Sequence, residues 1–188
     1  MRVIAGLYGG RRLRAPAGID TRPTSDRVRE ALFSVLGAEV EGARVLDLFA
    51  GSGALGIEAL SRGAEEATFV DSSEAAMRCV RANLEALGLR AHTRRSDASA
   101  FLRSASARGN HYDLVFLDPP YSSAARIGAE LTSRLPDVLA PGATVVCESA
   151  RRQPLSLDLP LRDERRYGDT LIRIHDSRQP HRSLPRVV

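Results

Sequence analysis

The sequence predicts an α/β fold in which a mostly parallel sheet carries helices on both faces. From Ala43 onward, short runs rich in aliphatic residues alternate with glycine-containing loops and helical stretches, which is typical of repeated strand–helix units. Near the end, two strand-like runs flank Gly168-Asp169, and this predicts an antiparallel hairpin at one edge. The 188 residues suit one domain, and 43% hydrophobic with 27% charged residues is ordinary for a globular protein.

The chain opens with two elements ahead of the repeating units. Residues 2–14 alternate apolar and polar side chains around Gly9-Gly10, which predicts a β-hairpin. Residues 21–26 then offer several N-cap side chains before a helix. The apolar residues of 28–36 fall on one face of that helix, and Gly37 ends it.

The repeating units supply the sheet and its covering helices. Expected strands cover residues 44–49, 68–70, 91–95, 113–117, 144–148, 161–167 and 170–175. Expected helices run from the first glycine loop to near Gly63, over Glu74–Leu87, up to about Arg103, and over about 125–135, with Pro141-Gly142 turning into the next strand. We expect one domain over 1–176, with a hairpin extension (1–22) and a core (23–176), before a flexible basic tail (177–188).

The charge balance favours acidic partners, because the formal net charge is +4 and the sequence pI about 9.7. Apart from histidines, every basic side chain is arginine, which makes forked phosphate contacts and stacks on bases. The absence of lysine excludes P-loop, Schiff-base and lysine general-base chemistry. Candidate nucleic-acid contacts near the N-terminus are Arg2, Arg11, Arg12, Arg14, Arg22 and Arg27. A solvated basic edge that discourages strand aggregation explains the hairpin arginines equally well.

The cysteines bear on the compartment. Cys79 and Cys147 are far apart and have no metal-ligand spacing, so we expect buried free thiols in a reducing environment and no metal site. The N-terminus lacks the apolar segment of a signal peptide, and no apolar run is long enough to span a membrane. We therefore expect a cytoplasmic protein. Nothing in the sequence requires a partner subunit, so a monomer is expected.

A glycine-rich segment, residues 51–56, has the G-x-G-x-x-G spacing of a nucleotide-binding loop between a strand and a helix. Asp71 ends the next strand about 20 residues later, where an acid can bind ribose hydroxyls. A dinucleotide and S-adenosylmethionine both satisfy this pattern. Asp47 beside the loop can meet a cofactor ammonium group and Asp97 an adenine amine, which favours S-adenosylmethionine. Singly, Asp71 as a helix cap and Asp97 as a turn residue are equally good interpretations.

We expect the chemistry in the stretch from Tyr112 to Tyr121. Its first half is a buried strand, which Pro119-Pro120 end because neither proline can donate a ladder hydrogen bond. The stiff loop presents the Asp118 carboxylate, a carbonyl and the Tyr121 ring at the edge where open α/β sheets bind ligands. Two acceptors beside an aromatic face suit a planar amine such as a nucleobase amino group, and hydride transfer has no evident use for them. The alternative is a turn that caps a core strand.

Four segments resemble motifs of class I S-adenosylmethionine-dependent methyltransferases that act on exocyclic amines: residues 47–53, Asp71, Asp97 and residues 118–121. Three more segments resemble the bacterial RsmD-type family: residues 1–6, 21–31 and 58–64. The similarity spans about residues 1–176. It implies a Rossmann-like class I methyltransferase fold with a seven-stranded sheet and an N-terminal hairpin that assists RNA binding.

The resemblance also implies a function: methyl transfer from S-adenosyl-L-methionine to guanine N2 of 16S rRNA in the small ribosomal subunit. Cofactor contacts are expected from Asp47, Phe49, Gly51, Ser52, Gly53, Asp71, Ser72, Asp97 and Ala98. Catalysis is assigned to Asp118, Pro119, Pro120 and Tyr121. The chain departs from many relatives in having Asp71 in place of glutamate, and arginines where lysines are common in the hairpin.

In the expected reaction a guanine amine attacks the cofactor methyl carbon in line. Asp118 and the Pro119 carbonyl orient the poorly nucleophilic amine, and Tyr121 stacks on the splayed base. A DNA adenine or cytosine amino-methyltransferase is the closest alternative, and a non-catalytic RNA-binding assembly factor is another. Carbon-5 cytosine methylation is disfavoured because the loop has no cysteine. An oxidoreductase is disfavoured because the usual lysine partner is missing.

Overall fold

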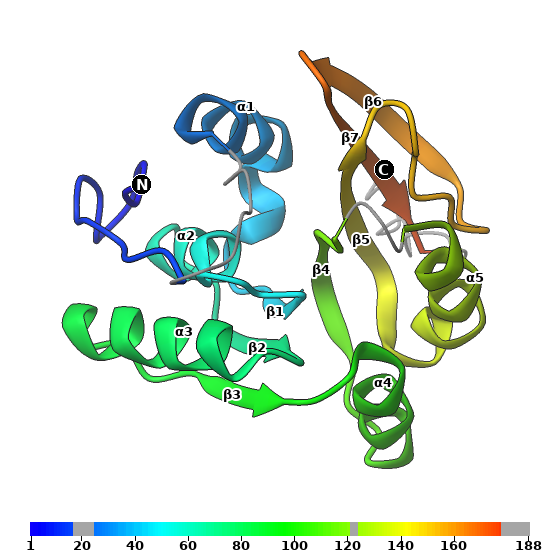
Figure 1. Ribbon diagram of the computed structural model, residues 1–188, viewed down its shortest axis with the longest axis horizontal. Coiled ribbons are helices and arrows are strands. Elements are labelled where there is room, and N and C mark those ends of the chain that lie inside the picture. Colours follow the sequence, from blue (N-terminus) through cyan, green and yellow to red (C-terminus); the bar gives the residue numbers. More distant parts are fainter. Residues whose placement is uncertain (17–24, 121–123, 178–188) are drawn as a thin grey trace, which may run out of the picture.

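The computed structural model describes residues 1–16, 25–120 and 124–177, and its centre is a seven-stranded sheet (Figure 1). The order across the sheet is β3-β2-β1-β4-β5-β7-β6. The strands are β1 (Arg44–Leu48), β2 (Glu66–Asp71), β3 (His92–Arg95), β4 (Tyr112–Leu117), β5 (Leu139–Ala150), β6 (Leu161–Tyr167) and β7 (Thr170–Asp176). Strands β1 to β5 pair in parallel, whereas β7 is antiparallel to both β5 and β6. The predicted parallel sheet with an antiparallel hairpin edge is confirmed.

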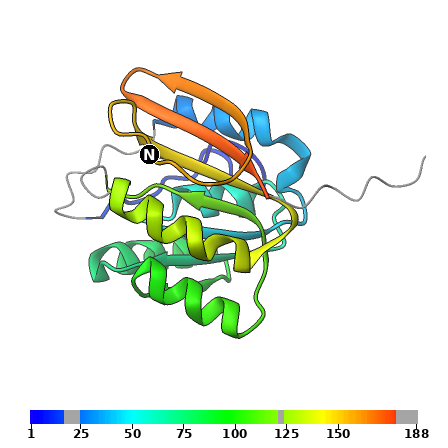
Figure 2. The same cartoon turned by 90° about the vertical axis from the view of Figure 1, so that its right-hand side faces the viewer.

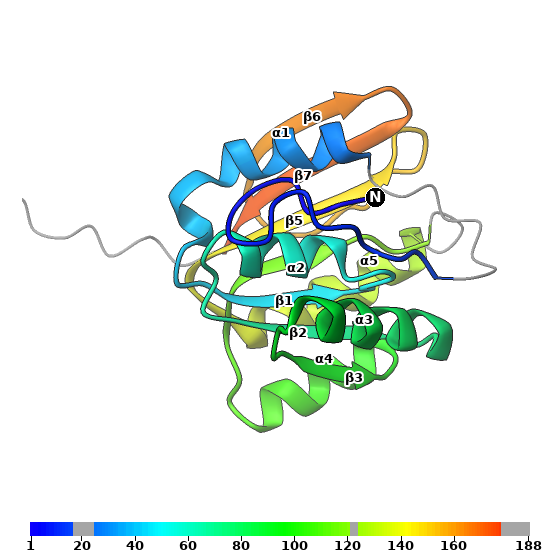
Figure 3. The same ribbon diagram turned by 90° about the vertical axis from the view of Figure 1, so that its left-hand side faces the viewer.

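Helices cover both faces of this sheet, as the sequence predicts. They are α1 (Asp26–Leu36), α2 (Ala54–Ser61), α3 (Glu74–Leu87), α4 (Ala98–Ala107) and α5 (Ala124–Arg134), with short 3-10 turns at Gly37–Val40 and Leu135–Val138. Figure 2 shows α4 and α5 in front of one face, and Figure 3 shows α1, α2 and α3 in front of the other.

Two apolar clusters, one on each side of the sheet, form the core. The cluster under α1, α2 and α3 includes Phe33 and Phe116, whose ring centroids lie 5.7 Å apart. The cluster under α4 and α5 includes Leu102 and Leu131. Fully burying such a side chain contributes about 1.5–3 kcal/mol. Because the central strands are buried on both faces, their sequences are nearly continuous apolar runs.

Helix α3 has the bounds that its sequence predicts, because both of its ends carry strong signals. The Ser73 side chain accepts a hydrogen bond from the Ala76 amide, and Gly88 ends the helix with φ +66°. Helix α4 extends to Ala107, beyond the expected end near Arg103. No glycine or proline follows Arg103 until Gly109, so the sequence gives no stop signal before the end of the helix.

The Pro141-Gly142 prediction is wrong. The pair does not precede β5 as a turn, because β5 begins at Leu139 and contains both residues. The register with β4 jumps between Tyr112 and Leu114, whose partners are Leu139 and Thr144. Proline is tolerated here because the irregular segment requires no ladder hydrogen bond from it.

The predicted N-terminal hairpin forms, but with an irregular ladder in place of regular strands. Its two arms are joined by an antiparallel bridge between Arg2 and Arg12 and by hydrogen bonds from the Val3 amide to the Arg11 carbonyl, at 2.9 Å, and from the Leu13 amide to the Met1 carbonyl, at 3.2 Å. The backbone between the arms also bonds to α2: the Ile4 and Ala5 amides donate to the Glu58 carboxylate, at 2.7 and 3.1 Å. A tertiary partner thus shortens the hairpin ladder. Figure 3 shows the segment lying across α1 and α2.

Some predictions fall beyond the described ranges. Arg22, Tyr121 and tail residues 178–188 lie outside the described residues. Ser177, which we expected to begin the tail, donates its amide to the Ala143 carbonyl at 2.8 Å and so extends the ordered edge of the sheet. In the part of the chain that the structure describes, no helix is long and apolar enough to cross a membrane.

Candidate active site

The carboxyl ends of β1, β2 and β4 meet at one edge of the sheet. The register pairs Leu48 of β1 with Val70 of β2 and with Leu117 of β4. Asp71 and Asp118 each follow directly after their paired residue, and Asp47 directly precedes Leu48. The parallel pairing therefore gathers the three acids predicted from separate motifs.

The glycine loop, residues 49–53, connects β1 to α2 with unusual backbone angles. Phe49, Gly51 and Gly53 have φ of +81°, +55° and +79°. The strain at Phe49 is offset by the Phe49 and Ala50 amides, which both donate to the Val70 carbonyl at 2.9 Å. A Cβ added at Gly51 would meet no atom within 4 Å, so the loop leaves open space at its first glycine.

The third glycine of the motif has a packing role. A Cβ at Gly56 would lie 2.4 Å from the Phe69 ring and 3.2 Å from the Asp47 carboxylate. Helix α2 therefore lies against β2 more closely than any side chain permits. That contact lets the Gly56 amide donate to Asp47 Oδ2 at 3.0 Å.

Asp47 is the deeply buried acid of the site, with 2% of its surface exposed. Burial is the main cause that raises its pKa to about 7; the Gly56 hydrogen bond opposes this rise and the nearby Asp71 charge adds to it. Among the described residues, no arginine or histidine forms an ion pair with it. A cationic ligand would supply the missing countercharge.

Asp71 holds the glycine loop in place. Its Oδ2 accepts from the Gly51 amide at 2.9 Å and its Oδ1 from the Ser73 amide at 2.8 Å. Ser73, not Asp71, caps α3. Ser72, between them, is exposed at the same edge, and Ser52 of the loop is half-buried.

Asp97 caps α4, so the interpretation as a local structural residue is correct for one of its oxygens. Oδ1 accepts from the Ser99 and Ala100 amides, at 2.9 and 3.2 Å. The side chain is exposed, and Ala98 beside it is half-buried. Capping by one oxygen leaves the other able to accept a further hydrogen bond.

The proline corner, Asp118-Pro119-Pro120, begins where β4 ends. Asp118 is half-buried, Pro119 is buried and Pro120 is exposed. Burial raises the pKa of Asp118 well above its ordinary value, and the Glu148 and Asp47 carboxylates raise it further. The proline corner thus lies within electrostatic reach of the acid beside the glycine loop, on the same rim of the sheet.

The Arg14 backbone is connected to this edge through one bridging residue. Asn83 of α3 donates to the Ser52 carbonyl at 2.9 Å and to the Arg14 carbonyl at 3.1 Å. It thereby ties the N-terminal segment to the glycine loop. The exposed arginines of this part of the chain are Arg2, Arg11, Arg12, Arg14 and Arg27. Arg2 pairs with Asp26 at 3.5 Å.

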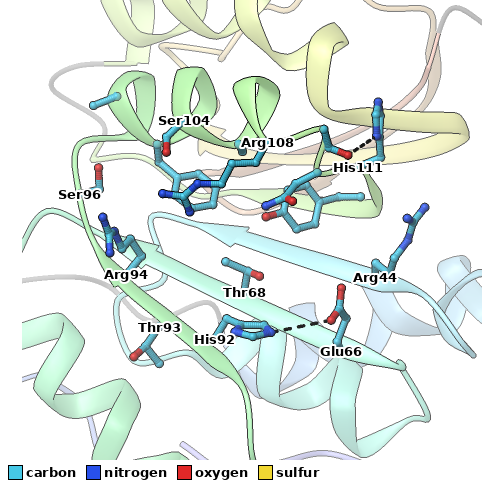
Figure 4. Close-up of a pocket in the computed structure, with 16 residues that line it drawn as sticks. Arg44, Glu66, Thr68, His92, Thr93, Arg94, Ser96, Ser104, Arg108 and His111 are labelled. Atoms are coloured by element: carbon cyan, nitrogen blue, oxygen red, sulfur yellow. Dashed lines mark hydrogen bonds and ion pairs between the residues drawn. The ribbon is translucent and has the colours of Figure 1, made fainter.

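A groove of about 750 Å³ lies elsewhere, between α4 and strands β2 and β3 (Figure 4). It includes the first residues of four strands: Arg44, Glu66, His92 and Tyr112. These are the amino ends of the strands, opposite the rim with Asp47 and Asp118. This groove is therefore not the predicted site. No group of three or more metal-ligating side chains occurs among the described residues.

Known proteins are similar to this chain in sequence and in structure. A family model described as Conserved hypothetical protein 95 matches residues 1–176. The chain belongs to this family. Its curated relatives include the Escherichia coli ribosomal RNA small subunit methyltransferase D, 43% identical over 122 residues, or 64% of this chain and 60% of the relative. Bacillus subtilis YlbH is 50% identical over 123 residues, or 64% of this chain and 67% of YlbH.

The family is the RsmD-type methyltransferase family that the motifs resemble. The chain spans about two thirds or less of the length of these two curated relatives. A solved structure covers more: Escherichia coli yhhF has a TM-score of 0.80 and 36% identity, covering 96% of this chain and 99% of that one. The Rossmann-like methyltransferase fold is therefore confirmed over nearly the whole chain.

Sequence reasoning missed two buried acids of this RsmD-type domain. Glu148 of β5 is 4% exposed and Glu58 of α2 is fully buried. Each is a single acid within an otherwise apolar run, and this is the signal that could have identified them. It also missed Asn83, since a lone polar residue on a helix gives no comparable signal.

Proposed function

We propose that this protein transfers the methyl group of S-adenosyl-L-methionine to the exocyclic N2 amine of a guanine in 16S rRNA. The observation that carries the proposal is the meeting of the glycine loop, Asp47 and the proline corner at one rim of the sheet. Family membership supports the same class of reaction. We further propose that the protein acts as a monomer in the cytoplasm, on the small ribosomal subunit or its RNA.

The residues at the glycine loop fit the cofactor. Asp47 is a buried acid that lacks a countercharge among the described residues, which suits the cofactor's ammonium group. The open space at Gly51 allows close approach to the backbone. Asp71 and Asp97 would accept hydrogen bonds from ribose and adenine, with Phe49, Ser52, Gly53, Ser72 and Ala98 beside them. When bound, S-adenosylmethionine supplies an electrophilic methyl carbon on a sulfonium sulfur.

The proline corner would hold the base. Asp118 and the Pro119 carbonyl accept the two hydrogens of the guanine amine and point its lone pair at the methyl carbon. Such orientation can contribute several kcal/mol to lowering the barrier. The new nitrogen–carbon bond would replace the carbon–sulfur bond of the cofactor, and the Asp118 carboxylate would stabilise the positive charge that develops on the nitrogen. The nitrogen then loses one proton. Tyr121 would stack on the base, and Pro120 keeps the corner stiff.

RNA binding would use the N-terminal arginines. Arg2, Arg11, Arg12, Arg14, Arg22 and Arg27 could contact phosphates on either side of the flipped base. Asn83 ties the Arg14 backbone to the glycine loop, so this basic segment is fixed close to the cofactor site. Phosphate contacts of this kind position the nucleic acid without reading its sequence.

The test is transfer of a labelled methyl group to isolated small subunits, naked 16S rRNA and duplex DNA, with nuclease digestion to identify the modified base. We expect N2-methylguanosine from one of the RNA substrates. Label in DNA alone would favour a DNA amino-methyltransferase, and no label on any substrate would favour a non-catalytic assembly factor.

A matched pair of variants tests the assignment of the proline corner. Asp118→Ala should lower turnover at least about 1,000-fold, since it removes an interaction made with the developing charge. Asp113 is a carboxylate at the opposite end of β4, paired with Arg44 at 2.8 Å. Asp113→Ala should keep turnover within about threefold. Wild-type turnover by the Asp118 variant would overturn the catalytic assignment.

A further inference from the structure

Glu148 lies beside Asp118 on the neighbouring strand. Cys147 of β5 pairs with Leu117 of β4, so the next residue on each strand, Glu148 and Asp118, are also neighbours. Glu148 is 4% exposed, which is rare for a glutamate. The Glu148 charge is one of the causes of the raised pKa of Asp118, in keeping with a short separation of the two carboxylates.

The two carboxylates extend from the same face of the sheet. Side chains alternate along a strand, and Phe116 and Val146 pack in the cluster under α1, α2 and α3. Leu117 and Cys147 pack in the cluster on the other side. Asp118 and Glu148 therefore share the face of Phe116 and Val146, which is also the face of Asp47, bonded to α2.

Methyl transfer as described above requires only one of these two acids. Asp118 and the Pro119 carbonyl already accept both hydrogens of the exocyclic amine. Burying a second acid close to the first is costly because like charges repel in a poorly solvated site. A second acid at this position is suited to accept a hydrogen bond from a second donor on the substrate, next to the amine.

The base edges differ at the position next to the amine. Guanine carries the N1–H donor beside its N2 amine. Adenine carries the N1 acceptor beside its N6 amine, and cytosine carries the N3 acceptor beside its N4 amine. A carboxylate is an acceptor only, so it would bind the guanine edge and repel the other two.

We propose that Glu148 accepts the N1–H of the target guanine and thereby selects guanine over adenine and cytosine. This inference rests on the proposed function, because it needs the amine to lie at Asp118. Glu148 lies outside the motifs described above, so its role in base specificity is an addition to them. Sites that hydrogen-bond a polar group discriminate strongly against analogues that lack it, because their own polar groups are left unpaired.

The experiment uses 2-aminopurine, which keeps the 2-amine but has an unprotonated N1. Methyl labelling by the wild-type protein first identifies the target guanine. Small subunits are then reconstituted with 16S rRNA that has been ligated from fragments and carries either guanine or 2-aminopurine at that position. The wild type should prefer guanine by about 100-fold in kcat/KM. Glu148→Gln should reduce this preference to below about fivefold, since its amide can rotate to donate to the unprotonated N1.

Controls separate base reading from folding. Glu130→Gln, at an exposed position of α5, should retain the wild-type preference. Binding of S-adenosylhomocysteine to Glu148→Gln should stay close to wild type, and its melting temperature should not fall below that of the wild type. Glu148→Asp, which retains the carboxylate, should keep a preference of at least about tenfold.

Three outcomes overturn the inference in distinguishable ways. If Glu148→Gln keeps both the 100-fold preference and the wild-type kcat/KM, Glu148 does not read N1–H. If it keeps the preference but lowers kcat/KM equally on both RNAs, Glu148 acts only through Asp118. If the wild type labels no guanine, the proposed function itself fails, and the role of Glu148 falls with it.

Discussion

Two buried carboxylates contact α2 in different ways. Glu58 is fully buried on the helix and accepts from the Ile4 amide, the Ala5 amide and the Arg62 side chain, at 2.7, 3.1 and 2.7 Å. Asp47 is 2% exposed on β1 and accepts a hydrogen bond from the Gly56 amide. Glu58 has its countercharge within the fold, whereas Asp47 has none among the described residues.

The difference separates a structural acid from a binding acid. A buried carboxylate with several donors holds its partners in place, and Glu58 fixes the N-terminal segment on α2. A buried carboxylate without a cation costs stability until a ligand supplies one. Burial alone therefore does not identify a binding residue. A buried carboxylate that lacks a positively charged partner within the fold does indicate one. Four predictions test this contrast, from the largest effect to the smallest.

The largest effect is on the pH dependence of stability. Because the pKa of Asp47 is raised from 3.8 to about 7, the folded protein holds a proton that the unfolded chain has lost between these values. The free energy of unfolding contributed by Asp47 therefore falls as pH rises through this window. Asp47→Asn should unfold at nearly wild-type urea concentrations at pH 4 and be more stable by up to about 4 kcal/mol at pH 8. A difference that stays constant with pH would contradict this.

Glu58→Gln should lower the free energy of unfolding by about 3 kcal/mol, because it removes the charged partner of a buried pair. Arg29, fully buried on α1, also loses a stabilising charge, since Glu58 opposes the burial that lowers its pKa. Urea unfolding measures the loss, and Glu65→Gln, at an exposed position, is the matched control. If Glu58→Gln is as stable as the control, Glu58 does not stabilise the fold and the assignment of Glu58 as a structural acid is wrong.

Asp47→Asn should weaken S-adenosylmethionine binding at pH 8 by about 100-fold, or about 2.7 kcal/mol, because a neutral amide cannot balance an ammonium group. Isothermal titration measures this loss. Glu58→Gln, folded at low temperature, should bind within about twofold of the wild type. Equal losses in the two variants would show that neither acid contacts the cofactor.

The smallest effect is expected from Arg62, which pairs with Glu58 and lies over the Phe33 ring at 5.0 Å. Arg62→Met should destabilise the fold by about 1 kcal/mol, since Glu58 retains its two backbone donors and the methionine still packs on the ring. Urea unfolding of Arg62→Met, Glu58→Gln and the double variant would measure the coupling. Strictly additive losses would mean that the pair contributes nothing.

The sequence predicted most elements because their signals are local. Ser73 and Gly88 mark the ends of α3, and Pro119-Pro120 mark the end of β4. Predictions failed where a distant group replaced a local one. Gly9-Gly10 predicts a hairpin, and its arms do bond to each other, but regular strands are lost where the Ile4 and Ala5 amides bond to Glu58, more than 50 residues away. Pro141 should precede a strand, yet a register jump accommodates it inside β5.

Spacing along the chain is enough to predict the fold class, the glycine loop and the acids at the ends of successive strands. Which acids meet, and which have partners within the fold, follows from strand pairing and helix packing. Asp118 and Glu148 are 30 positions apart in sequence and neighbours on paired strands. Whether a buried carboxylate has a positively charged partner within the fold depends on the donors that folding brings to it. Spacing along the chain does not encode those contacts.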